Sequence, residues 1–337
     1  MSLKSGVKRL VDLLGVNDSA IRWHRSKMLV LCYHAVVAER REHSWSYDNC
    51  VDRQSFLDQL VWLKSLMEPT DLAGLRKWRD GGWTAKKGPL LITFDDGYRN
   101  NLTQAAPILQ REGVPALFFL ATGLVGTDRV LWNDEMRVRI SRWPEPEIRM
   151  PSGEVAAVPR EIEARRDLAT HATQNSKALA SDSCAEYLAY LRSKTPSLEV
   201  MDDPEARAFM TWDEVRQLKS MGFEVGAHTV EHPILSQAEA NSVDAELRDS
   251  KAKIERELNC PCVSMAYPNG TEKDVNAAVV ASARRAGYEW SFMTTPYWHQ
   301  VGDDPHCIPR ICVPGHAGLD AFKLYASGLR SFLAGGA

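Results

Sequence analysis

Residues 89–97 read PLLITFDDG, an unbroken apolar run from Pro89 to Phe94 that ends in Asp95-Asp96-Gly97. A short apolar run that stops at a turn signal is typical of a strand buried on both faces, as in parallel sheets covered by helices. Asp95 and Asp96 would then lie at the carboxyl end of this strand. The alternative is that the same residues form a turn whose aspartate only caps the next helix.

Similar apolar runs occur on both sides of this strand and alternate with helical patterns. Strands are expected at 28–33, 115–121, 223–227, 262–267, 288–294 and 308–313, and helices at 56–66, 101–112, 212–221, 237–258, 272–286 and 319–332. Strands that alternate with helices indicate βα units and a parallel sheet. We therefore predict an α/β protein, and about seven parallel strands favour a closed or nearly closed barrel over an open sheet.

Residues 125–210 differ from the rest of the chain, because prolines interrupt them and only 160–195 has a helical pattern. We predict an N-terminal helical segment at 1–27, a barrel built from 28–124 and 211–332, and a largely helical insertion at 125–210. The N-terminal segment has apolar residues at helical spacing, so it either packs on the barrel or touches a membrane surface. Asp12 interrupts the apolar run that a secretory signal would need.

Composition and charge argue against a nucleic-acid-binding, a membrane-spanning and a disulfide-rich protein. The formal net charge is −3 and no long Lys/Arg run occurs, which argues against a nucleic-acid partner. The longest apolar run, residues 114–126, is too short for a transmembrane segment, which needs about 20 residues. The odd number of cysteines, 7, favours reduced thiols over a disulfide scaffold. We expect a cytoplasmic protein, with a secreted or periplasmic location left open if a signal has been removed.

Titratable residues recur where the expected strands end. In a parallel barrel, chemistry takes place just beyond the carboxyl ends of the strands. These ends carry Tyr33-His34, Asp95-Asp96, His228, Tyr267-Pro268-Asn269 and Arg310. We therefore expect the reactive groups of the protein among these residues.

His228 and His232 are four residues apart, so on one helical turn both imidazoles would point the same way and share a metal ion. Two neutral histidines and one carboxylate leave open positions for water and substrate. The alternative is a pair of solvated loop histidines. The same residues, His-Thr-Val-Glu-His, also match the H-x-x-E-H pattern of zinc peptidases, in which Glu231 would be the base. That chemistry needs a continuous helix, and Pro233 disfavours helical geometry at His232.

The combination of TFDDG at 93–97, H-[ST]-x-x-H at 228–232 and Y-P-x-G at 267–270 resembles the polysaccharide deacetylase family (NodB homology, carbohydrate esterase family four). The similarity extends from about residue 28 to 330. Tyr33-His34 is similar to the first strand of the exopolysaccharide-modifying branch. The resemblance implies a distorted (β/α) barrel that removes an N-acyl group, usually acetyl, from an amino sugar of a polysaccharide or glycoconjugate. It also implies one divalent metal ion, for which Zn²⁺ is expected.

The resemblance also assigns roles to residues. It implies that Asp96, His228 and His232 bind the metal and that Asp95 is the catalytic base. Thr229 would brace the loop that carries the two histidines. A backbone N–H near Asn269 would help to form the oxyanion hole.

Two family features are not matched. Ala266 stands where many members have an arginine that orients the base, and Arg310 is the candidate replacement, with an ordinary ion pair as the alternative. The usual C-terminal Leu-x-x-His pattern is absent, so His34 is expected to be the general acid and His316 is the alternative. Because of the missing arginine, a catalytically silent carbohydrate-binding relative stays possible beside the hydrolase and the zinc peptidase.

Two aromatic residues are expected to contact the sugar. Tyr267 belongs to the third motif, and Trp132 lies in a Leu-Trp-Asn-Asp-Glu segment similar to a tryptophan-rich segment of exopolysaccharide deacetylases. Packing in the protein interior is the alternative role for Trp132.

Overall fold

The computed structural model describes residues 15–40, 49–195, 204–315 and 318–329. Most of the expected N-terminal helix lies outside these ranges, and so does His316. Helix α2 (Val16–Trp23) is the part of that segment that is described. No helix within the described ranges has both the length and the apolar character that crossing a bilayer requires.

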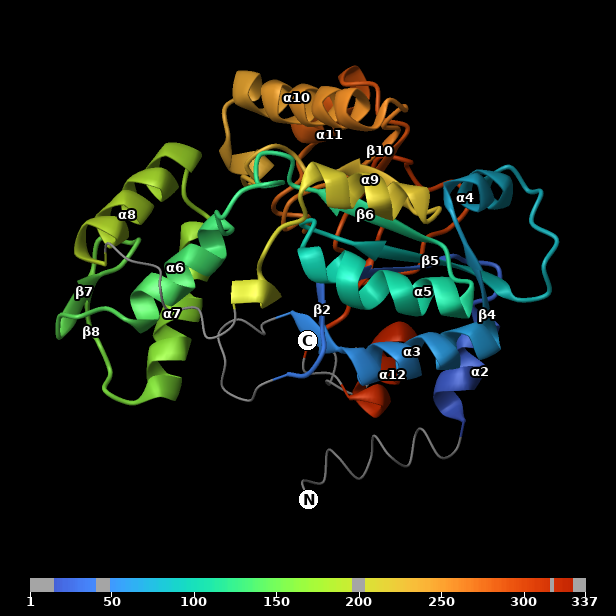
Figure 1. Cartoon of the computed structure of the whole chain (residues 1–337), viewed down its shortest axis with the longest axis horizontal. Helices are drawn as coiled ribbons and strands as arrows, with labels where there is room; N and C mark the ends of the chain where they lie inside the picture. Colours follow the sequence, from blue (N-terminus) through green and yellow to red (C-terminus); the bar gives the residue numbers. More distant parts are fainter. Residues whose placement is uncertain (1–14, 41–48, 196–203, 316–317, 330–337) are drawn as a thin grey trace.

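Parallel strands form the centre of the molecule (Figure 1). In spatial order they are β11 (Trp290–Phe292), β10 (Ser264–Ala266), β9 (Glu224–Ala227), β6 (Ala116–Leu120), β5 (Gly88–Phe94), β1 (Leu29–Tyr33) and β12 (Ile311–Cys312). A further strand, β4 (Met67–Thr70), pairs with the first half of β5. Every residue of β5 is buried, as its sequence predicts.

The two ends of this row approach each other. Ile308 forms a parallel bridge with Phe292 of β11, and four residues later Cys312 pairs with Cys32 of β1. Residues 308–312, which include β12, therefore contact both β1 and the strand at the opposite end of the row, β11. This arrangement confirms the expected distorted (β/α) barrel of about seven parallel strands.

Helices surround the strands, with α10 and α11 on one side and α3 and α12 on the other (Figure 1). The barrel helices are α3 (Arg53–Leu66), α4 (Leu72–Arg79), α5 (Ala106–Glu112), α9 (Trp212–Ser220), α10 (Ala240–Leu258), α11 (Ala277–Arg285) and α12 (Leu319–Ala326). Short elements complete this part: β2 (Ala35–Val37), β3 (Cys50–Asp52), the π-helical turn η2 (Asn101–Ala105) and the 3₁₀ turns η3 (Pro204–Ala206) and η4 (Leu235–Gln237).

Several element bounds differ from the expectation. The helix expected at 272–286 begins only at Ala277, because the Asn276 side chain accepts a hydrogen bond from the Val279 N–H and caps the helix there. Strands β2, β3 and β4 were not expected, because three or four residues are too few to show a period. Helix α4 was not expected either.

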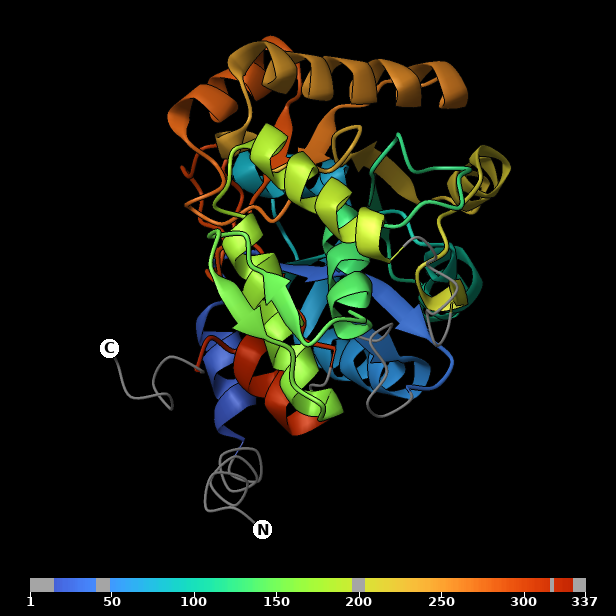
Figure 2. The same ribbon diagram turned by 90° about the vertical axis from the view of Figure 1, so that its left-hand side faces the viewer.

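Residues 132–194 form a group beside the barrel that faces the viewer in Figure 2. The group consists of α6 (Trp132–Ser141), the hairpin β7 (Glu147–Arg149) and β8 (Val155–Ala157), α7 (Ile162–Ser176) and α8 (Ser181–Lys194). The stretch 160–195, expected to be helical, is thus two helices. They pack on α6 around a separate cluster of buried apolar side chains that includes Ile140, Trp143 and Leu188.

Candidate active site

The turn after β5 brings both aspartates to one cleft. Successive side chains of a strand point to opposite faces. Here β5 ends at Phe94, and the Asp95 N–H still donates to the Tyr33 carbonyl at the end of β1 (2.9 Å) before the chain turns. Asp96 and Gly97 then adopt left-handed conformations, with φ of 74° and 87°. A β-carbon at Gly97 would lie 2.9 Å from Leu120 Cδ2, so only glycine fits at this turn.

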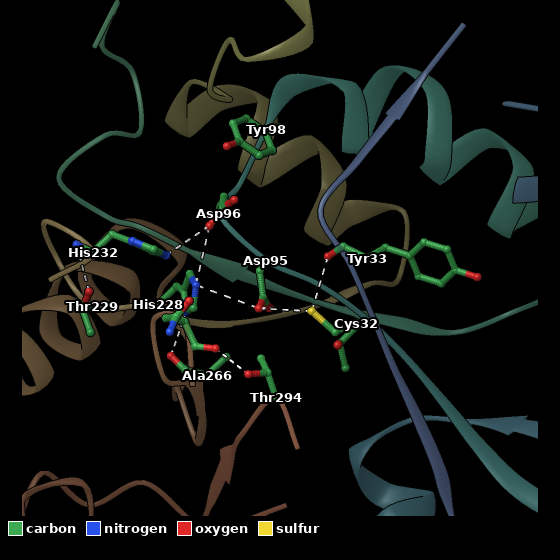
Figure 3. A network of polar contacts seen from close by, with 12 residues as sticks. Cys32, Tyr33, Asp95, Asp96, Tyr98, His228, Thr229, His232, Ala266 and Thr294 are labelled. Carbon is green, nitrogen blue, oxygen red and sulfur yellow. Dashed lines mark hydrogen bonds and ion pairs between the residues drawn. The ribbon is translucent and has the colours of Figure 1, made fainter. Parts of the chain in front are cut away.

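Asp96, His228 and His232 converge in this cleft (Figure 3). The Oδ1 atom of Asp96 lies 3.5 Å from the Nε2 atom of each histidine. The Nδ1 atom of His228 is 2.8 Å from the Ala266 carbonyl oxygen. Nδ1 must therefore carry the proton, and in the neutral ring the Nε2 lone pair faces Asp96.

These three residues fit a bound cation. Burial lowers the pKa of both histidines to about 4, so both rings are neutral at pH 7. Burial also raises the pKa of Asp96. The buried Asp96 Oδ1 has no hydrogen-bond donor among the described residues. A carboxylate oxygen and two neutral imidazole nitrogens that converge in a buried cleft are stabilised by a positive ion, and this donor set is typical of a catalytic divalent metal.

The two histidines lie on a loop and not on a helical turn. Thr229 and His232 have φ of 65° and 57°, and the Thr229 hydroxyl accepts a hydrogen bond from the His232 N–H (3.1 Å). The carboxylate of Glu231 pairs with Arg129 (3.1 Å) and is 45% exposed. The zinc-peptidase interpretation, which needs a helix and Glu231 beside the metal, is therefore wrong.

Arg310 clamps Asp95 inside the barrel. Its two terminal nitrogens donate to the two carboxylate oxygens, each at 2.7 Å, and Nε donates to the Met293 carbonyl at 3.0 Å. Burial alone would raise the pKa of Asp95, but the charges of Arg310 and His228 hold it well below its usual value. Arg310 is fully buried. Of the ordinary ion pairs considered for it, a surface pair is therefore excluded and a buried structural pair is not. Arg310 contacts Asp95 as an arginine replacing Ala266 would be expected to do.

His34 follows β1 and lines the cleft on the side of Asp95. One of its ring nitrogens lies within 4.8 Å of both a carboxylate oxygen of Asp95 and the sulfur of Cys32. Nδ1 of His34 is buried and has no hydrogen-bond partner among the described residues. The geometry thus leaves this ring able to exchange a proton with a bound molecule.

The third motif contributes Asn269 to the cleft but not Tyr267. The Tyr267 side chain is fully buried and its hydroxyl donates to the His306 carbonyl (3.1 Å), so it cannot contact a substrate as expected. Its N–H donates to Phe292, whereas the described residues offer no hydrogen bond to the Asn269 N–H. The Asn269 side chain accepts from Lys177 Nζ (2.6 Å).

Residues 132–194 supply one wall of the cleft, whose volume is about 340 Å³. Trp132 is half-buried there, and its indole N–H donates to the His232 carbonyl (3.0 Å). Asn133, Asp134, Arg137 and Lys177 also line this wall. These four residues were not predicted from the sequence, because no motif or strand end marks them.

Comparisons with known proteins agree with the geometry. A family model described as polysaccharide deacetylase matches residues 83–291. The poly-beta-1,6-N-acetyl-D-glucosamine N-deacetylase of Escherichia coli K12 is 26% identical over 118 residues, which are 34% of this chain and 17% of that enzyme. The chain therefore matches only about a sixth of the length of this curated relative.

Two solved structures have a similar fold. Deacetylase PplD from Streptococcus pyogenes, solved with acetate, superposes with a TM-score of 0.58 at 18% identity, over 88% of this chain and 96% of that one. IcaB from Ammonifex degensii gives 0.57 at 17% identity, over 89% and 97%. Because the family model covers more than half of the chain, this protein belongs to the polysaccharide deacetylase family.

Proposed function

We propose that this protein hydrolyses the N-acetyl or a related N-acyl group of an amino sugar in a polysaccharide or glycoconjugate. The proposal depends on one divalent ion, Zn²⁺ in the first instance, held by Asp96, His228 and His232. The convergence of Asp96 Oδ1 with the Nε2 atoms of two neutral histidines, one of them fixed with its Nε2 lone pair toward Asp96, carries the proposal. When bound, such an ion activates water and polarises the acyl carbonyl.

Asp95 is the general base in this proposal. Its depressed pKa keeps it ionised at neutral pH, and the two hydrogen bonds from Arg310 fix its orientation. Its Oδ2 atom lies 3.9 Å from Nε2 of His228, so it borders the metal ligands without being one of the three. From this position it takes the proton of the attacking water.

His34 and Asn269 serve the other two steps. The Asn269 N–H donates to the oxyanion of the tetrahedral intermediate. His34, on the Asp95 side of the cleft, returns a proton to the departing amine of the sugar. Trp132 lies at the wall of the cleft, where its ring stacks on a sugar.

The E. coli relative is named for poly-β-1,6-N-acetyl-D-glucosamine, so N-acetylglucosamine oligomers are the first substrates to test. The experiment compares metal content and acetate release in the wild type, Asp96→Ala and Asp95→Asn. We expect Asp96→Ala to lose the metal. Asp95→Asn should keep it and lose about 10²–10⁴-fold in rate, the usual contribution of a general base.

Asp213→Asn is the matched control, because this carboxylate is 92% exposed on α9, outside the cleft. Its metal content and rate should equal those of the wild type. If Asp95→Asn empties the site, the roles of the two aspartates are wrongly divided. If the metal-loaded wild type binds oligomers and releases no acid from any N-acylated sugar, the protein is a silent carbohydrate-binding relative.

A further inference from the structure

A second cavity, of about 580 Å³, lies next to the candidate active site. Trp132 and Ile234 line both spaces, so the cleft and this cavity adjoin at these two side chains. Its apolar lining comes from α8, the residues before α6 and the residues after His232: Leu124, Val130, Leu179, Ala185, Leu188 and Pro233. The volume lies within the usual range for small-molecule sites.

The arginines at this cavity are all ion-paired. Arg129 pairs with Glu231 (3.1 Å), and Arg192 donates to both carboxylate oxygens of Glu135 (2.8 and 2.7 Å), which Arg139 also contacts (2.7 Å). The remaining acid, Asp128, is exposed at the rim. A ligand inside the cavity therefore meets mostly apolar surface, and its arginines already have carboxylate partners, which favours an uncharged aliphatic group.

The position of the cavity indicates which part of a substrate reaches it. The acyl group must enter the closed end of the cleft, where Asp95, Asp96 and His228 are 2%, 3% and 1% exposed. The sugar then lies toward Trp132 and Ile234, so a substituent of the sugar that extends past these two side chains reaches the second cavity. We propose that the cavity binds an aliphatic aglycone of the amino-sugar substrate. This inference rests on the proposed function and adds a substrate class to it.

The first test compares the methyl and octyl β-glycosides of N-acetylglucosamine as substrates. Burying one methylene group is worth roughly a fourfold change in binding. We therefore expect the octyl glycoside to have a KM at least about tenfold lower in the wild type. Equal KM values for the two glycosides would overturn the proposal.

Two variants localise the effect. Ala185→Trp fills the mouth of the cavity, and Leu179→Asp places a charge in it. Ala189→Trp and Ala178→Asp are the matched controls, because both alanines are exposed and neither lines the cavity. Both cavity variants should lose the octyl advantage, leave the methyl glycoside unchanged and unfold at the temperature of their controls. If a cavity variant unfolds at the temperature of its control and still has the lower KM for the octyl glycoside, the proposal is contradicted.

Two further measurements distinguish the aglycone proposal from an acyl chain in the cavity and from a failure of the hydrolase proposal. If the cavity variants change only the preference for N-octanoyl over N-acetyl methyl glucosaminide, the aglycone assignment is wrong and the acyl chain is the occupant. Binding of octyl β-D-glucoside, which has no amide, is measured by calorimetry. If it binds and no substrate is hydrolysed, the hydrolase proposal fails and the cavity assignment stands. If the substrates are hydrolysed but octyl β-D-glucoside does not bind, the hydrolase proposal stands and the cavity assignment fails.

Discussion

Asp95 and Arg310 form a buried ion pair between residues far apart in the sequence. Ala266 stands where the resemblance leads us to expect an arginine. Arg310, the residue before β12, donates to both carboxylate oxygens of Asp95. A fully buried arginine is tolerated only when its charge is paired and its donors are used. Here Thr93, Asp95 and Met293 accept its hydrogen bonds.

We predict that Arg310→Met raises the pKa of Asp95, because burial, which raises it, remains while the opposing charge is lost. The acidic limb of the rate profile should move to higher pH and kcat should fall. Metal content should stay unchanged, since Arg310 contacts none of the three candidate ligands. The measurement is kcat against pH at matched metal occupancy.

Arg310→Lys is the control, because it keeps the positive charge and loses the two parallel hydrogen bonds. Its acidic limb should therefore lie between those of the wild type and Arg310→Met. Breaking a buried pair also costs about 3–5 kcal/mol of stability, which thermal unfolding of both variants checks. An unchanged acidic limb in Arg310→Met would show that the pair is only structural.

The general acid is tested at His34. We predict that His34→Ala lowers kcat by about 10²–10⁴-fold across the pH profile, because the departing amine then has no proton donor. Metal content should not change. His316→Ala should leave rate and profile intact, and the reverse result would move the acid to His316.

The loop from His228 to His232 is the element on which the metal site depends. Neither a helix nor a strand holds it, so the hydrogen bond from the His232 N–H to the Thr229 hydroxyl keeps the two rings together. The N–H groups of Val230 and Glu231 both donate to Glu246 of α10 (2.7 and 3.0 Å). The positions of the candidate ligands therefore depend on polar contacts around them.

We predict that Thr229→Val, which keeps the shape and removes the hydroxyl, weakens metal binding by about 10–100-fold, the usual effect of losing such a supporting contact. Chelator competition measures the metal Kd. Thr229→Ser retains the hydroxyl and should bind metal like the wild type. Equal Kd values for the valine and serine variants would contradict this role.

At the scale of the whole molecule, burying two histidines in the cleft makes folding depend on pH. Both have a pKa of about 4 in the folded chain and about 6.5 when unfolded. Between these values the unfolded chain binds more protons, so stability rises with pH. Neutral histidines stabilise the fold fully above about pH 6.5, and this contribution is lost as the pH falls toward 4.

We predict that the Tm of the chelator-treated protein falls as the pH is lowered from about 6.5 to 4. Differential scanning calorimetry across this range measures it. His232→Asn removes one of the two titrating groups, so its Tm should depend less steeply on pH. A wild-type Tm that is constant across the window would mean that the histidines are not buried as neutral groups.

Much of the fold was predictable from local patterns. The buried strand at 89–94 and its neighbours were recognisable because apolar runs and turn residues are local properties of the chain. The strand-end rule also predicted that His34, Asp95, Asp96 and His228 lie near each other, because parallel strands end at one edge. Strands β2, β3 and β4 escaped prediction because they are too short to show a period. The exact helix starts escaped it because capping hydrogen bonds set them, as at Asn276.

The sequence by itself determined the class of fold and the residues that carry chemistry, because both follow from spacing along the chain. Only the tertiary structure decided how these residues are used. In the folded chain the Tyr267 side chain is buried in the core and Arg310 pairs with Asp95. Lys177 and Trp132 line the cleft. These contacts join residues far apart in the chain, and packing, which no periodicity records, selects them.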